Sequence, residues 1–416
     1  MTAIAEASEV RLSAGARLIA RTGASAATLT IALGAGLASL AMNFWIPFLP
    51  LYMLRLGATT DANALFWVGV AVTGQGIARL ISGPIWGILS DRVGRKIMFI
   101  RALYFATATT LIAAFATEPW HVAVAFACQG LFSGFIPAAV ALTSVTVPEN
   151  RLGESLGLVT GAQYLGNTVG PAIGAGLAIV LGLRGAIFAA ALMPALAATL
   201  VLFAVPRDRV ERRAAETVAD AVEPDRGIRS LMTAQFSLAL FLYFCLFAMT
   251  QVIRLATPIS LKEITGHDGA AVVVGIAFTI AGIGSVVGVL VVARRFVRQG
   301  NFRKALVIGC AATGVAHVLL AASGSVPMFI AWFAVISLVQ AAMLPASNTL
   351  IAANVPRARR GTAFGLAGSA QALAFMVGPM SAAFFAAASL SFGFVLLGML
   401  FFGLGALLLL ALREPR

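Results

Sequence analysis

Long apolar stretches, separated by short polar breaks, run along almost the whole chain. A helix needs about 20 apolar residues to cross a hydrocarbon core about 30 Å thick. Gly and Pro inside such stretches are compatible with helix, because neighbouring helices in a membrane bundle satisfy the backbone groups that they free. The pattern therefore predicts an all-α membrane protein with twelve transmembrane helices, over 28–54, 66–89, 97–117, 121–146, 155–181, 185–205, 230–257, 270–293, 303–322, 326–353, 362–387 and 390–412.

One long charged stretch, residues 206–229, interrupts this pattern in the middle of the chain. We interpret it as a solvated cytoplasmic linker between an N-terminal bundle, residues 1–205, and a C-terminal bundle, residues 230–416. Part of the linker could instead form an amphipathic helix on the membrane surface.

An internal repeat supports the division into halves. Gly170 and Pro171 recur as Gly378 and Pro379, a shift of 208 residues, which is half the length of the chain. The same shift relates further pairs: Gly74 and Gly282, Gly76 and Gly284, Arg95 and Arg303, Lys96 and Lys304, Pro137 and Pro345, Gln163 and Gln371. Two six-helix halves related in this way are typical of carriers that bind substrate near the bilayer midplane and alternate access by rocking.

Composition and charge agree with a protein that lies in the bilayer. The chain is 60% hydrophobic and 11% charged, and its formal net charge is +13. The Arg and Lys residues recur in every second loop rather than in one basic face or tail, so we expect no nucleic-acid partner. By the positive-inside rule this distribution puts both termini and the basic loops in the cytoplasm.

The sequence gives no sign of catalysis or of a cofactor. The three cysteines lie far apart inside apolar stretches, which indicates reduced packing residues and no metal site. P-loop and H-E-x-x-H motifs are absent from the sequence. The first apolar stretch is too long for a signal-peptide core, so the N-terminus is expected to remain attached.

The loop after the second stretch resembles a signature of the major facilitator superfamily, G-x-L-x-D-R-x-G-R-K. The matching residues are Gly87, Asp91, Arg92, Gly94, Arg95 and Lys96. The resemblance implies that Asp91 stabilises the outward-facing state by pairing with nearby Arg and with the N-terminal dipole of the eleventh helix. The alternative is a turn whose charges only set the topology. In the second half Gln299 stands where Asp91 stands in the first, so a matching contact there is weakened or absent.

The fifth stretch resembles the pattern G-x8-G-x3-G-P-x2-G-G of exporters, especially the bacterial twelve-span drug/proton antiporters. The matching residues are Gly157, Gly166, Gly170, Pro171 and Gly174, and Ala175 replaces the last Gly. The resemblance implies multidrug efflux by a monomer in the bacterial inner membrane, coupled to protons. Glycines four residues apart also allow close helix contact, so generic packing is the alternative.

Proton coupling rests on the resemblance and not on residues. The sixteen acidic residues all lie outside the middle of the predicted helices, whereas a proton-driven carrier usually needs a titratable group there. Many such exporters also have an Arg three residues before Gln-Gly in the fourth helix, and this chain has Phe126 before Gln129 and Gly130.

Arginines and amides inside the predicted helices are the candidates for substrate contact. Arg79 lies twelve residues before Asp91, roughly 18 Å inside the loop at about 1.5 Å per residue, and Gln75 shares its face. Arg254 is the second buried cation, unless it extends to the outer surface. The other candidates, each of which could also serve helix packing, are Asn43, Phe48, Gln163, Asn167, Tyr243, Gln251, Gln340 and Gln371.

Three functions fit these observations. The first is proton-coupled efflux of amphipathic drugs or small organic molecules by alternating access. The second is a carrier for an organic anion or metabolite that uses Arg79, since the membrane interior holds arginines and no carboxylate. The third is a receptor or scaffold without transport, which gives no reason for a gating loop or a Gly-Pro hinge.

Overall fold

The computed structural model describes residues 26–132, 134–147, 152–206, 231–266, 270–293, 302–356 and 360–413, and these ranges are helical and contain no strand. Eleven of the helical segments are long and apolar enough to cross a membrane. The linker predicted at 206–229 falls almost entirely outside the described residues, so the domain boundaries stay a prediction.

The described part of the N-terminal half contains five helical segments, one of which is interrupted. They are α2 (Ala26–Trp45) continued by η1 (Ile46–Phe48) and α3 (Leu49–Arg55), then α4 (Asp61–Val93), α5 (Arg95–Ala114), α6 (Pro119–Phe132) with α7 (Phe135–Thr146), and α8 (Leu152–Ala204).

The described part of the C-terminal half contains six helical segments. They are α10 (Ala234–Thr265), α11 (Ala270–Val287) continued by the π-helical η4 (Gly288–Val292), α13 (Phe302–Ala321), α14 (Val326–Ala353), α15 (Arg360–Ala388) and α16 (Leu390–Ala411).

Helix α8 contains two of the predicted spans. Its 53 residues would reach about 80 Å as one straight helix, far more than a bilayer core. The backbone leaves the helical conformation at Gly182, where φ is +70°, a value that glycine adopts without steric cost. The chain reverses there, and the eleven segments become the twelve spans that the sequence predicts.

Two helices extend beyond their predicted bounds because polar residues continue them. Helix α4 begins at Asp61 rather than at 66, and the Thr60 side chain caps it by accepting from the backbone N–H of Asn63 at 3.1 Å. Helix α10 continues past 257 to Thr265. The fourth span divides near Gly134, whose φ of +60° lies in the left-handed region.

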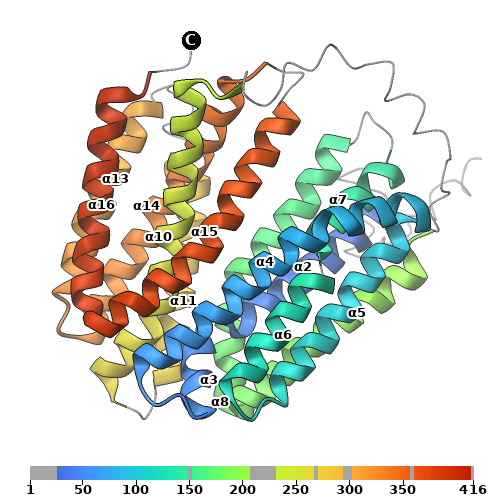
Figure 1. Ribbon diagram of the computed structural model, residues 1–416, viewed down its shortest axis with the longest axis horizontal. Helices are drawn as coiled ribbons and strands as arrows, with labels where there is room; N and C mark the ends of the chain where they lie inside the picture. The colour runs from blue at the N-terminus through green and yellow to red at the C-terminus, as the bar shows by residue number, and fades with distance from the viewer. Residues whose placement is uncertain are drawn as a thin grey trace, which may run out of the picture.

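The two halves form separate helical groups whose largest contacts are between four long helices. Helix α4 packs against α15, and α8 packs against α11. The hydroxyl of Thr73 in α4 donates to the carbonyl oxygen of Met376 in α15 at 2.8 Å. Figure 1 shows the groups close together at the edge near α3 and α11, and diverging toward the opposite edge, where α16 ends.

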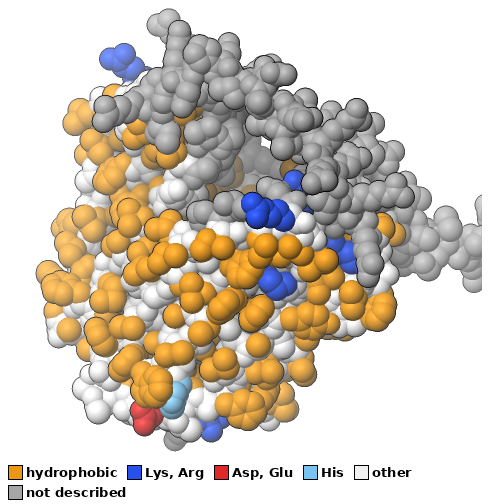
Figure 2. All heavy atoms as spheres, turned by 45° about the vertical axis from the view of Figure 1, so that its right-hand side comes forward, with side chains coloured by type: hydrophobic (Ala, Val, Ile, Leu, Met, Phe, Trp, Pro, Cys, Tyr) orange, Lys and Arg blue, Asp and Glu red, His pale blue; other side chains and the backbone are white. Residues whose placement is uncertain are grey.

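The outer surface is apolar, as expected for contact with lipid. Large hydrophobic side chains such as Phe203 and Leu410 are more than four-fifths exposed. Figure 2 shows hydrophobic side chains over most of the described part of one face, with few charged ones among them. In water such a surface would cause association, so the bilayer is the natural solvent of this fold.

Candidate functional site

A cavity of about 250 Å³ lies where α8 of the first half meets α10, α11 and α14 of the second. Its walls are mostly apolar, and Phe278 and Phe333 meet edge to face with ring centroids 5.3 Å apart. The polar side chains that line it are Asn167, Thr168, Thr250, Arg254, Ser285, Ser337 and Gln340. A pocket of this kind, apolar with a few polar groups, suits an amphipathic small molecule.

Arg254 is the charged residue among those that line the cavity, and it connects the two halves. Its Nη2 donates to Oδ1 of Asn43 in α2 at 2.5 Å. Nδ2 of Asn43 in turn donates to Oδ1 of Asn167 in α8 at 2.6 Å. The sequence predicted all three as cavity candidates, and the structure places them in one chain of hydrogen bonds.

Gln340 forms the opposite polar wall. Its Oε1 accepts from the hydroxyl of Thr250 at 2.8 Å, whereas its Nε2 is buried and has no hydrogen-bond partner in the part of the chain that the structure describes. Buried amide donors normally find a partner, and this one has almost no accessible surface, so it is an unsatisfied group inside the helix contact.

Several predicted candidates lie away from this cavity. Nε2 of Gln75 donates to Oε1 of Gln129 at 2.7 Å between α4 and α6, which is helix packing. Phe48 is 2% exposed and belongs to the hydrophobic core. The cavity lining also does not include Gln163, Arg79, Tyr243, Gln251 or Gln371.

Among these, Arg79 and Gln163 differ in burial. Arg79 lies near the middle of α4 with a solvent-exposed side chain and is not among the residues that line this cavity, so its contact with substrate stays a prediction. Gln163 is 8% exposed, and its Nε2 has no hydrogen-bond partner among the described residues.

The glycines of the Gly-Pro motif face α2. A Cβ at Gly166 would meet backbone atoms of Gly36 and Leu40, and one at Gly174 would meet the carbonyl oxygen of Phe44. Gly170 is similarly close to Leu40. Ala175, the departure from the pattern, instead packs against Gly275 of α11 in the other half. The backbone stays helical at Pro171, and Gly157 lies in the same helix.

The basic loop after α4 is built around a tight turn and a buried lysine. Gly94 has a φ of +106°, and its N–H donates to the carbonyl oxygen of Ser90. Nζ of Lys96 donates to the carbonyl oxygens of Leu202 at 2.8 Å and Val205 at 2.5 Å, at the end of α8. A cation there satisfies carbonyls that the helix leaves free.

The remaining residues of this loop are described only in part. Gly87 lies in α4, Arg92 is exposed, and Arg95 is half-buried. The side chain of Asp91 lies outside the described residues, as do residues 357–359 before α15, so the predicted contact of Asp91 is not tested.

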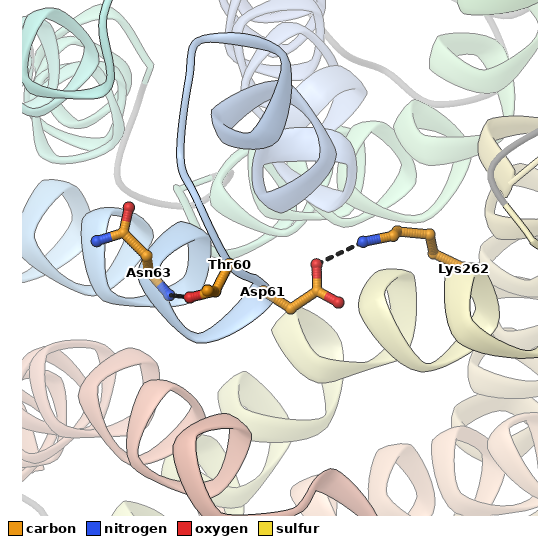
Figure 3. Close-up of polar contacts among 4 residues, drawn as sticks. All are labelled: Thr60, Asp61, Asn63 and Lys262. Atoms are coloured by element: carbon orange, nitrogen blue, oxygen red, sulfur yellow. Dashed lines mark hydrogen bonds and ion pairs between the residues drawn. The ribbon is translucent and has the colours of Figure 1, made fainter.

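At the far end of α4 an ion pair joins the two halves. Figure 3 shows Asp61, at the start of α4, facing Lys262 near the end of α10, with 2.5 Å between Oδ1 and Nζ.

Within the described ranges the other acidic residues, Asp91, Glu118, Glu154 and Glu263, also lie in loops or within three residues of a helix end. The cavity thus has a cation and no carboxylate.

Sequence reasoning missed the hydroxyls and aromatic rings of the cavity. Ser285 donates to the carbonyl oxygen of Ala281, and Thr250 shares its one proton between the carbonyl oxygen of Leu246 and Oε1 of Gln340. Both carbonyls lie one helical turn earlier, so in the sequence these hydroxyls are indistinguishable from helix-satisfied ones. Phe278 and Phe333 are two of 28 phenylalanines. The 208-residue repeat could have drawn attention to Gly282, which lines the cavity and corresponds to Gly74.

A family model described as Major Facilitator Superfamily matches this chain over residues 31–302 and 239–416. The chain is 31% identical to the multidrug resistance protein MdtG of Proteus mirabilis over 349 residues, which cover 82% of this chain and 84% of that protein. It is 29% identical to MdtG of Citrobacter koseri, over 88% of this chain and 89% of the relative.

Solved structures agree with this chain at the level of the fold. The nucleoside transporter NupG superposes with a TM-score of 0.72 at 14% identity, over 92% of this chain and 98% of that one. The D-xylose-proton symporter gives a TM-score of 0.71 at 15% identity, over 94% of this chain and 98% of the other. At this level of identity the likeness concerns the fold alone.

Proposed function

Because the chain belongs to the major facilitator superfamily, we propose that it is a secondary transporter that exports amphipathic small molecules in exchange for protons. The likeness to proteins named for multidrug resistance, at 31% identity over most of both chains, carries the proposal. The apolar, aromatic cavity between the halves supports it, since such a pocket accepts varied amphipathic compounds.

The charge pattern indicates how the protein is oriented in the membrane. We place both termini and the basic loops at the cytoplasmic face of a bacterial inner membrane, because Arg and Lys concentrate in those loops. The Asp61–Lys262 pair then lies at the outer face, and the halves diverge toward the cytoplasm. This arrangement is the state in which an exporter takes up its cargo.

An organic-anion carrier built on Arg79 has less support. Arg79 does not line the cavity, whereas the cavity contains enough apolar surface to bind a lipophilic body. A receptor or scaffold that transports nothing has less support as well, because it does not account for the polar contacts between the halves.

Reconstitution in liposomes tests the proposal. We expect the purified protein to move at least one of three lipophilic dyes under an imposed pH gradient: cationic ethidium, neutral phenylnaphthylamine or anionic anilinonaphthalene sulfonate. If none of them moves, the proposal of export is wrong.

A second measurement tests whether transport is coupled to protons. Collapse of the pH gradient with an ionophore should slow the dye flux, because the gradient then supplies no free energy. Flux that is indifferent to the gradient would remove proton coupling and leave the export proposal intact.

A further inference from the structure

The cavity has a fixed positive charge without a fixed negative partner. Arg254 carries five N–H donors, and the described structure gives it one hydrogen bond, to the neutral amide of Asn43. No carboxylate lines the cavity. An unpaired charge inside the membrane is costly, so this site favours a ligand that brings the opposite charge.

A second polar side chain lines the same space. Nε2 of Gln340 is buried without a partner, while its Oε1 accepts from Thr250. The hydroxyls of Ser285 and Ser337 line the cavity between them. Both hydroxyls donate to carbonyl oxygens of their own helices, so Arg254 supplies the free N–H donors of the cavity, and an oxyanion is the ligand that suits them.

The rest of the cavity is shaped for an apolar body. Phe247 from α10, Phe278 from α11 and Phe333 from α14 form its aromatic walls. The volume of about 250 Å³ admits one or two rings together with an acidic group.

We propose that this cavity selects amphipathic anions, with a carboxylate, sulfonate or phosphonate at Arg254 and an aromatic or aliphatic body among the phenylalanines. The inference rests on the export function proposed above and names the charge of its cargo. It places the anion contact on Arg254, in contrast to the sequence-based hypothesis for Arg79.

The position of Arg254 also connects binding to the conformational change. Its contact with Asn43 joins the second half to the first. An oxyanion competes with the Asn43 amide oxygen for the same guanidinium, so bound cargo weakens one of the contacts that hold the halves together near the outer face. Cargo thereby favours the outward-facing state.

Two dyes that share one ring system test the proposal. Anilinonaphthalene sulfonate is phenylnaphthylamine with an added sulfonate, so the pair isolates the acidic group. We expect the Arg254→Gln variant to bind the sulfonate about 10- to 100-fold more weakly, as for loss of a hydrogen bond to a charged group, and to bind phenylnaphthylamine as the wild type does. Arg254→Lys keeps the charge but not the planar fork of donors, so it should lose less sulfonate affinity than Arg254→Gln.

Two controls distinguish an effect of the cavity charge on binding from a loss of folded protein. Arg55→Gln removes an exposed cation at the end of α3, outside the cavity, and should leave sulfonate binding unchanged. If Arg254→Gln does not fold, Gln340→Glu keeps the arginine and supplies a fixed counter-charge, so it should abolish sulfonate binding and retain the neutral dye. Unchanged sulfonate affinity in both cavity variants, or equal loss of both dyes, overturns the proposal.

The export proposal fails differently from the anion proposal. If none of the three dyes moves in liposomes, export itself is wrong. If ethidium and phenylnaphthylamine move while the sulfonate is indifferent to Arg254, export stands and anion selection is wrong.

Discussion

At the scale of single residues, the buried Lys96 is the best defined electrostatic contact of the basic loop. It donates to two carbonyl oxygens at the end of α8, so Lys96→Met leaves those carbonyls without their donor. We expect this change to lower the free energy of unfolding by about 1 to 3 kcal/mol. Thermal unfolding in detergent measures it, and Arg92→Met, which removes an exposed cation of the same loop, should have a smaller effect.

Single residues were predictable by type but not by partner. Arg254, Asn43 and Asn167 stood out as polar residues in apolar helices, yet the contact between Arg254 and Asn43 joins positions 211 apart. Helices that are apolar on all sides give no periodic signal that fixes their rotation, so the sequence could not tell Gln340, at the cavity, from Gln75, in a packing contact.

At the scale of elements, the contact between α2 and α8 depends on glycine. Gly174→Ala places a methyl group against the carbonyl oxygen of Phe44, a backbone atom that cannot move aside. Since overpacking costs about 1 to 3 kcal/mol, we expect lower thermal stability and slower transport. Gly176→Ala is the matched control in the same helix: a Cβ there meets nothing within 4 Å, and the protein should be as stable or slightly more so.

The helices themselves could be predicted almost completely. The stretch 326–353 coincides with α14, and 390–412 differs from α16 by one residue. Errors are concentrated where polar residues extend a helix beyond its apolar stretch, as at Asp61 and at Lys262. Hydropathy reports the lipid-facing length, whereas caps and ion pairs set where a helix ends.

At the scale of the whole molecule, the Asp61–Lys262 pair contributes to the contact between the halves. A partly exposed pair contributes about 1 kcal/mol or less, which still changes the ratio of two close-lying states about fivefold. Asp61→Lys should slow transport by placing two cations together, and exchange of both charges, Asp61→Lys with Lys262→Asp, should restore it. Dye flux in liposomes is the measurement. A doubly exchanged protein as slow as the single variant would exclude the pair as a contact that matters for transport.

The lone cation of the cavity also makes the transport cycle sensitive to voltage. With a monoanion bound to Arg254 the cavity is electrically neutral, so its passage across the membrane does little work against the potential. The empty cavity is positive, and a cell interior that is negative attracts it back toward the cytoplasm. Each expelled monoanion then gains roughly 2.3 kcal/mol per 100 mV, a source of free energy that acts alongside any proton gradient.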